Sequence, residues 1–386
     1  MFRFLTAGES HGKALIAIIE GVPAGLPLDE NFVARDLIRR QGGYGRGQRM
    51  EIENDRAEIL SGVRHGLTIG SPISLLIPNR DWKNWKDLMS ILPMANKTEL
   101  VTHLRPGHAD LAGVVKYGLN DIRPILERAS ARETAARVAV GAVAKKLIEQ
   151  FQIEVRSHVV CIGGQWVKDT DTINWDQVEK SPVRSADPNA EKAMTATIDQ
   201  ARENGDSVGG VVEIIASGIP IGLGSYVHWN RRLDGRIAQA LMSIHAIKGV
   251  EIGAGFAHAN LLGSQAHDVI TYEGNRQWQH TTNRAGGIEG GMSNGEPVVI
   301  RTVVKPIPTL GKPLSSVDLI TGNPVEAHVE RSDVCVVPAA GVVGEAMLAI
   351  VLADALLEKF GGDHITETLR NYQKYLGSIG PGRGDE

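Results

Sequence analysis

Residues 344–360 read GEAMLAIVLADALLEKF, and this stretch is apolar on nearly every side of a helix. A helix with one apolar stripe lies on a protein surface, whereas a helix that is apolar all round belongs in the interior. We therefore predict a buried central helix here, ended by the two glycines that follow Phe360. The other elements must pack around this helix.

Three further stretches have the periodicity of amphipathic helices. Residues 28–40 and 236–246 are two of them. The strongest pattern runs from Ser130 to Phe151, and Ser130 with Glu133 matches the S-x-x-E capping box that opens many helices. One face of this predicted helix is a continuous apolar stripe made of Ala136, Val140, Val143 and Leu147.

Strand-like composition appears in three places, at residues 71–77, 211–217 and 297–304. The order of helices and strands along the chain lacks the regular alternation that builds a parallel sheet. We therefore predict the α+β class, with helices packed on mostly antiparallel sheets. Composition does not shift sharply anywhere, so the pattern gives no reason to place a domain boundary.

The bulk composition excludes several functional classes. The net charge is only −4 over 386 residues, so no overall field favours nucleic acid or a membrane surface. No apolar run reaches the roughly 18 residues of a membrane span. The two cysteines, Cys161 and Cys335, form no C-x-x-C pair, which excludes a zinc ribbon or a disulfide framework. We expect a soluble protein of a reducing compartment, the cytoplasm.

Arginines concentrate in two groups, and each lies beside a glycine-rich loop or a helix start. Helix N-termini attract anions, and the planar guanidinium fits phosphate and carboxylate groups. The pattern therefore leaves two interpretations open, a site for small anions and solvated faces with local ion pairs. The first group is Arg35, Arg39, Arg40, Arg46 and Arg49, and the second is Arg123, Arg128, Arg132 and Arg137.

Two loops are suited to close approach of the backbone to a ligand. Residues 283–295 (NRAGGIEGGMSNG) contain five glycines, and residues 305–313 (KPIPTLGKP) contain three prolines. Neither is a phosphate-binding P-loop, and no G-x-G-x-x-G follows a strand. Any cofactor must therefore bind without the usual dinucleotide turn.

Residues 8–12 (GESHG) match the G-x-S-x-G turn that exposes a nucleophilic serine, which makes Ser10 a candidate. Only seven residues precede Gly8, too few to build the central sheet that such a turn needs. His11 is the better candidate, together with His108 in RPGHAD, because histidine titrates near neutral pH and carries protons. No H-x-x-x-H or H-E-x-x-H spacing indicates a metal site.

Several long motifs in register resemble the chorismate synthase family. They include residues 8–25 (GESHGKALIAIIEGVPAG), 127–143 (ERASARETAARVAVGAV) and 331–348 (RSDVCVVPAAGVVGEAML). RPGHAD, IKGVEIG, AGGIEGGMSNGEP and KPIPT fill the intervals as in that family. The resemblance covers residues 1–360 and implies a single domain there, followed by a C-terminal extension, 361–386, that is flexible at its end.

The resemblance implies a lyase of the shikimate pathway, which makes the precursor of the aromatic amino acids. Such an enzyme converts 5-enolpyruvylshikimate 3-phosphate to chorismate and phosphate by a 1,4-anti elimination. It requires reduced FMN although the reaction has no net redox change. The family implies a homotetramer that acts on a small molecule, without nucleic acid or membrane. No nicotinamide turn is present, which favours an external supply of reduced flavin over reduction by bound NADPH.

The resemblance also assigns residues to roles. His11 would protonate or hydrogen-bond the departing phosphate, His108 would stabilise the charge of the reduced flavin, and Asp333 would help the flavin to accept the ring hydrogen. Anion binding falls to Arg40 and Arg46, with Arg49 and Arg132 as further candidates; the charge argument does not separate substrate from a nicotinamide nucleotide. Flavin contacts carry over to Arg128, Ala129, Ser130, His245, Ala246, Gly290, Lys305, Pro306, Ile307, Pro308, Thr309 and Arg331.

Two rival functions predict different behaviour. A serine hydrolase using Ser10, His108 and an aspartate would react with a fluorophosphonate and need no flavin. A non-catalytic binder of RNA or phosphometabolites would show strongly salt-dependent oligonucleotide binding.

The sequence departs from the family pattern after Asp333, because the family often has a proline at the next position and this chain has Val334. A proline would make this turn more rigid.

Overall fold

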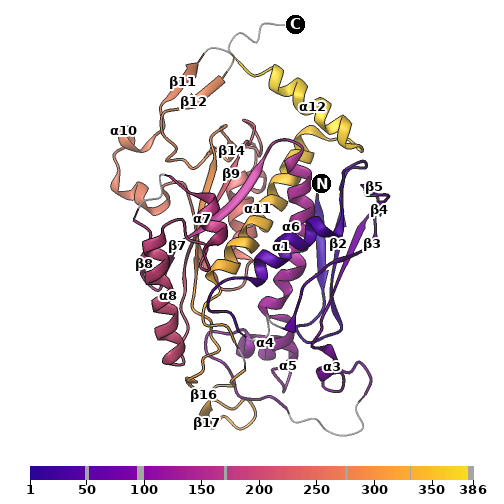
Figure 1. Ribbon diagram of the computed structural model, residues 1–386, viewed down its shortest axis with the longest axis vertical. Helices are drawn as coiled ribbons and strands as arrows, with labels where there is room; N and C mark the ends of the chain where they lie inside the picture. Colours follow the sequence, from indigo (N-terminus) through magenta and orange to yellow (C-terminus); the bar gives the residue numbers. More distant parts are fainter. Residues whose placement is uncertain (48–51, 94–99, 169–171, 274–276, 331, 381–386) are drawn as a thin grey trace.

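The computed structural model describes residues 1–47, 52–93, 100–168, 172–273, 277–330 and 332–380. Two antiparallel sheets lie on either side of a pair of long helices (Figure 1). The helices are α6 (Thr134–Glu149) and α11 (Val337–Phe360). This arrangement confirms the α+β class predicted from the sequence.

The first sheet has four strands and packs against α6. Leu15, Ala17 and Ile19 are buried, and the residues between them are more exposed. An alternation of this kind is typical of a sheet that is covered on one face. In spatial order the strands are β1 (Arg3–Ala7), β2 (Ala14–Glu20), β6 (Ile73–Pro78) and β3 (Glu58–Ser61).

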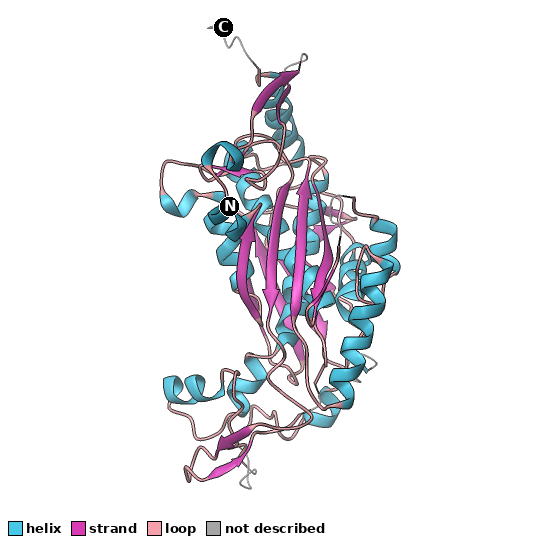
Figure 2. Ribbon diagram, turned by 90° about the vertical axis from the view of Figure 1, so that its left-hand side faces the viewer, coloured by secondary structure: helices cyan, strands magenta, loops and turns pink. Residues whose placement is uncertain are grey.

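The second sheet has five strands and packs against α11. Its long strands run side by side along the molecule (Figure 2), and Val212, Ile214 and Ala216 form its buried side. The strand order is β10 (Ile247–Ile252), β15 (Val298–Val304), β9 (Gly210–Ser217), β7 (Glu154–Ile162) and β8 (Gln165–Trp166). Four two-stranded pairs complete the described strands: β4 (Val63–Arg64) with β5 (Leu67–Thr68), β11 (Ile270–Glu273) with β12 (Gln277–His280), β13 (Ile288–Glu289) with β14 (Met292–Ser293), and β16 (Ser315–Val317) with β17 (Pro324–Glu326).

Helix α11 is the centre of the hydrophobic core, as the apolar stretch predicts. It begins at Val337, seven residues before the quoted stretch, and nearly all of its side chains are buried. By length and composition alone it could cross a membrane, but 94% of its most apolar window is buried inside the fold. Burial of this extent is that of a core helix.

The two central helices approach closely because a glycine lies at their crossing. A Cβ on Gly141 of α6 would lie 2.2 Å from the Cβ of Ala346 in α11, which is closer than two carbon atoms can come. Small residues at such a crossing allow the helix axes to approach and add dispersion contacts. The pair therefore forms one rigid unit between the two sheets.

The predicted capping box at Ser130 does not form. Ser130 instead caps a short 3₁₀ turn, Ala131–Glu133, by accepting from the N–H of Arg132, and α6 follows at Thr134. Glu133 does not return to the Ser130 backbone because Thr6 Oγ1 and Arg137 Nε donate to its carboxylate. The Glu133 carboxylate therefore bonds to Thr6 and Arg137 in place of the Ser130 backbone N–H that a capping box would use.

The remaining helices cover the sheets or gather at one end of the molecule. In Figure 1, α3, α4 and α5 lie at the end where α6 and α11 begin. The described helices are α1 (Glu30–Gln41), α3 (Trp82–Trp85), α4 (Asp110–Tyr117), α5 (Arg123–Arg128), α7 (Trp175–Lys180), α8 (Pro188–Glu203), α9 (Leu233–Met242), α10 (Gly263–Ala266) and α12 (Ile365–Gly377), with further 3₁₀ turns at Trp229–Arg231 and Gly255–Asn260.

Helix α12 follows the predicted domain and packs onto it. The hydroxyl of Tyr372 donates to the carbonyl of Phe151, and that of Tyr375 donates to the carbonyl of Ile221. Thr368 on the same helix is fully buried. The end of the predicted flexible extension, residues 381–386, lies outside the described residues, and the division after residue 360 stays a prediction.

Candidate active site

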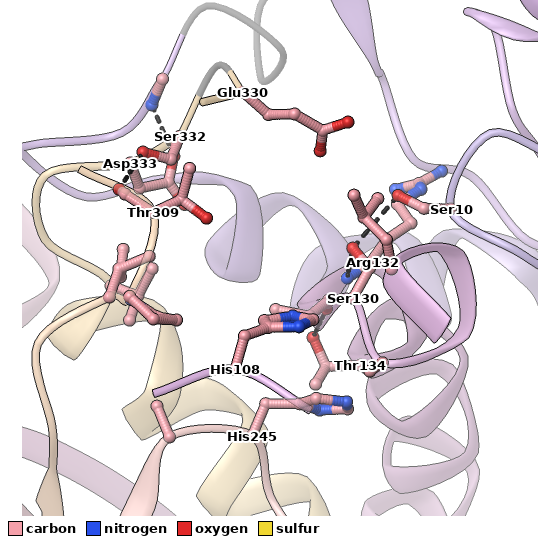
Figure 3. Close-up of a pocket in the computed structure, with 18 of the residues that line it drawn as sticks. Ser10, His108, Ser130, Arg132, Thr134, His245, Thr309, Glu330, Ser332 and Asp333 are labelled. Carbon is pink, nitrogen blue, oxygen red and sulfur yellow. Dashed lines mark hydrogen bonds between the residues drawn. The ribbon is translucent and has the colours of Figure 1, made fainter. Parts of the chain in front are cut away.

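A cavity of about 630 Å³ lies where the first turns of α6 and α11 meet. Unpaired N–H groups and the helix dipole give both N-termini a preference for anions. Figure 3 shows Ser10, Ser130 and Arg132 on one side of it and Thr309, Ser332 and Asp333 on the other. The cavity brings together these predicted residues: His11, Arg40, Arg46, His108, Ala129, Ser130, Arg132, His245, Ala246, Lys305, Ile307, Pro308, Thr309 and Asp333.

Two buried arginines form a cationic wall. Arg40 reaches the cavity from the end of α1, where its Nε donates to Thr134 Oγ1 at 2.9 Å and its Nη1 to Asp55 at 3.3 Å. Arg132 donates to the other oxygen of Asp55 at 2.6 Å and to Asn79 at 3.0 Å. Asp55 lies between the two guanidinium groups and holds both in place.

The electrostatics of this wall favour a bound anion. Burial lowers the pKa of the Arg40 guanidinium from its ordinary value; Asp55 opposes this effect, while Arg46 and Arg132 add to it. Arg132 Nη2 is buried without a hydrogen-bond partner among the described residues, although Glu53 lies 3.6 Å away. A phosphate or carboxylate in the cavity would be attracted by the guanidinium groups of this wall, and the planar guanidinium suits both anions.

Asp333 is held on the opposite side. Its Oδ1 accepts from the N–H of Gly47 at 2.5 Å, and its Oδ2 pairs with Arg46 Nη1 at 3.2 Å. The next residue, Val334, donates its N–H to the carbonyl of Gly45 at 2.8 Å, a bond that proline cannot make. In this chain a hydrogen bond therefore holds the turn that a proline ring would otherwise stiffen.

His11 is fixed at the edge of its ring and over its face. Its Nδ1 lies 2.8 Å from Glu127 Oε1, and its backbone N–H donates to Glu127 Oε2 at 2.7 Å. Trp85 stacks on the imidazole with 3.8 Å between the ring centres. The ring is largely buried and has little freedom to rotate.

His108 has a carboxylate partner of the same kind. Its Nδ1 lies 2.5 Å from Asp110 Oδ1, and Arg105 donates to the other oxygen of Asp110 at 2.8 Å. Burial alone would raise the pKa of Asp110, but hydrogen bonds from His108 and Arg105 outweigh it and lower that pKa. The charged carboxylate is therefore the stable form, and it orients the imidazole. Arg105 also donates to Thr309 across the cavity, at 3.1 Å.

His245 differs from the other two histidines because it lacks a carboxylate partner at Nδ1. That atom is buried without a hydrogen-bond partner in the described part of the chain. Burial lowers the pKa of His245; Glu133 raises it, and nearby cations lower it further, so the neutral ring is favoured. Ala246 has a φ of 68°, a conformation that side chains rarely adopt. The flavin contact predicted for His245 and Ala246 stays a prediction.

The strip of backbone from Lys305 to Thr309 forms the wall beside His245. The N–H of Lys305 donates to the carbonyl of Ala246, and Ser207 donates to the carbonyl of Ile307. Pro306 belongs to this strip but does not line the cavity. These bonds explain why the lysine- and proline-containing loop is an ordered wall.

Some predicted residues lie elsewhere. Arg128 is exposed and donates to the carbonyls of Gly8 and Thr6, so it braces the GESHG turn from outside. Gly290 lines a second hollow, together with His258, His267 and Asp268. Arg49 and Arg331 lie outside the described residues. Their proposed roles stay predictions.

The sequence reasoning missed residues that hold the predicted ones. Glu127, Asp110 and Arg105 were inside quoted motifs but received no role, while Trp85 and Glu330 were not considered. Their position in the sequence could have indicated them, because Asp110 lies two residues after His108 and Glu127 immediately precedes Arg128. Glu330 pairs with Arg123 at 2.8 Å; burial would raise its pKa, but His328 and Arg123 lower it to about 2.

Ser10 bonds to two elements next to the GESHG turn. Its Oγ donates to Ser130 Oγ at 3.1 Å, and its N–H donates to the carbonyl of Glu127. Ser10 therefore joins the GESHG turn to the start of α6.

Fold and cavity together are those of an α+β protein with a cavity lined by arginines and histidines, as in an enzyme that acts on a small molecule. The model of the family described as chorismate synthase matches residues 2–357. The chain is 59% identical to the chorismate synthase of Moorella thermoacetica over 98% of its length and 100% of that protein. It is 57% identical to that of Desulforudis audaxviator over 98% of each. A crystal structure of a chorismate synthase superposes with a TM-score of 0.80 at 46% identity and covers 98% of both chains.

The chain belongs to the chorismate synthase family. The resemblance stated from the motifs, the prediction of an enzyme and the predicted activity of this family are therefore confirmed. The serine hydrolase and the non-catalytic binder are set aside on the same ground.

Proposed function

We propose that this cavity converts 5-enolpyruvylshikimate 3-phosphate to chorismate and phosphate by 1,4-anti elimination in the presence of reduced FMN. The observation that carries the proposal is one cavity in which two helix N-termini, buried arginines and three histidines converge, in a chain of the chorismate synthase family. The reaction breaks a carbon–oxygen bond to phosphate and removes a ring hydrogen. The site must therefore stabilise the negative charge that develops on the phosphate and must assist removal of the hydrogen.

Charge complementarity supports the substrate. It carries a phosphate and two carboxylates, and the cavity offers Arg40, Arg46 and Arg132 beside the two helix starts. Preorganised cations act most strongly where water is excluded, because they need no reorganisation as charge develops on the leaving group. We assign Arg40 and Arg132 to the anionic groups of the substrate and keep Arg49 as a further candidate.

The cavity also has features that fit a flat heteroaromatic cofactor. Its apolar wall is formed by α11 residues and by the strip near Lys305, and the unpaired Nδ1 of His245 lies in the same region. Reduced FMN, when bound, supplies electron density to the allylic system of the substrate as phosphate leaves. The residues proposed to hold it are Ala129, Ser130, His245, Ala246, Lys305, Ile307, Pro308 and Thr309, which line the cavity, with Arg128, Gly290, Pro306 and Arg331 kept as predictions.

The chain's own groups handle the protons. His11 donates to the departing phosphate from the ring nitrogen that Glu127 leaves unused. His108 stabilises negative charge beside the cofactor, with Asp110 and Arg105 fixing its orientation. We assign Asp333 to assisting removal of the ring hydrogen; contacts with the Gly47 N–H and with Arg46 hold its carboxylate at the cavity.

We further propose that residues 1–360 form one catalytic domain, that the protein is a homotetramer acting in the cytoplasm, and that it needs no nucleic acid or membrane. External reduction of the flavin is the proposed supply, and mixing the FMN-loaded protein with NADPH under nitrogen tests it through the flavin absorbance. Sedimentation of the intact protein tests the tetramer.

An anaerobic assay tests the function. The protein is mixed with 5-enolpyruvylshikimate 3-phosphate and reduced FMN, and phosphate and chorismate are measured together. We expect equal amounts of both products and none with oxidised FMN. Turnover without reduced flavin, or labelling of Ser10 by a fluorophosphonate, would contradict the proposal.

A further inference from the structure

The contacts of His11 determine which of its two ring nitrogens is protonated and donates a hydrogen bond to Glu127. Both oxygens of Glu127 accept bonds: Oε1 from the ring of His11 and from Arg123 Nη1 at 3.4 Å, and Oε2 from the backbone N–H of His11. A carboxylate in this arrangement can only accept. Nδ1 of His11 must therefore be the donor, which leaves Nε2 as the nitrogen available to the cavity.

A second contact fixes the plane of the ring. Trp85 stacks on His11 with 20° between the planes, and the guanidinium of Arg123 lies 5.4 Å from the Trp85 ring centre. Arg123 also pairs with Glu127 and, at 2.8 Å, with Glu330. One arginine thus connects the residue at the edge of the imidazole with the residue over its face.

We propose that Glu127, supported by Trp85 and Arg123, is the positioning residue of His11 and keeps the proton on Nδ1 so that Nε2 faces the phosphate of the substrate. This inference rests on the role proposed above for His11. Glu127 is fully buried and does not itself line the cavity, so it acts through the imidazole. The carboxylate at Nδ1 stabilises the doubly protonated ring, from which Nε2 gives its proton to the leaving phosphate, and the neutral ring that remains keeps its proton on Nδ1.

The chain contains a matched control for this pair. His158 and Glu213 form another buried histidine–glutamate pair, with 3.0 Å between Nε2 and Oε1, and an arginine, Arg301, donates to the second oxygen. This pair lies on β7 and β9, and neither residue lines the cavity. A purely structural contribution of a buried histidine–glutamate pair should therefore appear in both places, and a positioning role only in the first.

The test compares Glu127→Gln, Glu127→Asp and Glu213→Gln in the anaerobic assay. In Glu127→Gln the amide oxygen accepts from the His11 backbone, and its NH₂ faces Nδ1 and favours the wrong tautomer. We expect kcat to fall about 10²-fold with KM within about threefold, because the proton transfer is lost and the binding groups remain. Glu127→Asp keeps the carboxylate, so its kcat should be about tenfold higher than that of Glu127→Gln. Glu213→Gln should lower stability without changing kcat.

A double-variant cycle separates positioning from structure. If Glu127 acts through His11, then His11→Ala with Glu127→Gln should be no slower than His11→Ala alone. A multiplied loss, or a kcat of Glu127→Gln equal to wild type, would overturn the proposal. Should Glu127→Gln fail to fold, Trp85→Leu in the same cycle carries the test, with the same non-additivity expected. Absence of chorismate from the wild-type protein would instead overturn the proposed function.

Discussion

Two buried charge clusters lie on opposite sides of the same helix turn. Arg39 and Arg40 are consecutive residues at the end of α1, yet Arg39 enters a cluster around Glu345 and Arg40 enters the wall of the cavity. Both clusters contain buried arginines and carboxylates. Only one of them borders an open space, and this difference separates structure from function.

The Glu345 cluster is closed on itself. Glu345 lies in the middle of α11 with no exposed surface, and it accepts from Arg39, Lys145 and Ser157 at 2.6–2.9 Å, with Arg184 at 3.5 Å. Burial would raise the pKa of Glu345, but Lys145, Arg39 and Arg184 outweigh it and hold that pKa well below its usual range. Arg184 Nε is buried without a hydrogen-bond partner among the described residues, yet neither Glu345 nor its cationic partners line the cavity, so this cluster has a structural role.

The cavity cluster differs in its position. Asp55 is shared by Arg40 and Arg132, Glu53 lies 3.6 Å from Arg132 Nη2, and both arginines line the cavity. Burial of arginines does not therefore indicate a binding site by itself. The indication comes from the cavity that the arginines of the second cluster line. Substitutions in the two clusters should accordingly separate catalytic from structural effects.

The largest effect on activity is expected at the cavity. His11→Ala removes the group that donates to the leaving phosphate, so kcat should fall about 10³-fold. The free energy of unfolding should change far less than in the Glu345 cluster. Anaerobic release of phosphate and chorismate measures the first quantity, and urea unfolding measures the second. Full activity in His11→Ala would remove this histidine from the mechanism.

The largest effect on stability is expected at Glu345. Glu345→Gln leaves Arg39, Lys145 and Arg184 buried without their central anion, which should lower the free energy of unfolding by about 3 kcal/mol. The folded variant should keep its kcat. Glu179→Gln is the control, because Glu179 pairs with the same arginines at the half-exposed edge and should cost less than about 1 kcal/mol. Equal losses in the two variants would contradict the comparison.

A smaller loss of activity is expected on the far side of the cavity. Asp333→Asn keeps the bond from Gly47 and removes the charge that pairs with Arg46, so kcat should fall about 10²-fold. KM should rise little or fall, because Arg46 becomes available to the anionic substrate. A kcat at the wild-type value would remove Asp333 from the proposed removal of the ring hydrogen.

The smallest effect concerns pH. The folded pKa of Glu345 is lowered from an unfolded value of about 4.3, so its contribution to stability is present above that value and is lost as pH falls toward the folded pKa. The stability difference between wild type and Glu345→Gln should be constant above about pH 5.5 and should shrink below about pH 4.3. Urea unfolding across this range measures it. A difference that grows on acidification would show that the ion pairs do not stabilise the fold.

Local patterns predicted much of the fold because their causes are local. The all-apolar stretch at 344–360 gave the core helix, and alternation or β-branched composition gave β6, β9 and β15. The capping box at Ser130 failed because Glu133 bonds to Thr6, which is 127 residues away. A motif predicts hydrogen bonds between residues that are close in sequence. It does not predict a distant residue that the fold brings near and that forms a competing bond.

The site shows the same division. Motifs indicated His11, His108, Arg40, Arg132 and Asp333, all of which line the cavity. They did not indicate Trp85, which belongs to no motif, or the role of Glu127, 116 residues from the histidine it holds. Nor could they tell Arg39 from Arg40, since both belong to one basic pair at a helix end.

The sequence by itself determined the α+β class, the core helix, the family and the chemical types present in the site, because periodicity and motif order are properties of neighbouring residues. Only the tertiary structure decided which charges are satisfied. Arg39 meets Glu345 across 306 positions and becomes structural, whereas Arg40, the next residue, lines the cavity. Pairing over such distances depends on how the helices pack, and packing depends on the shape of the whole core.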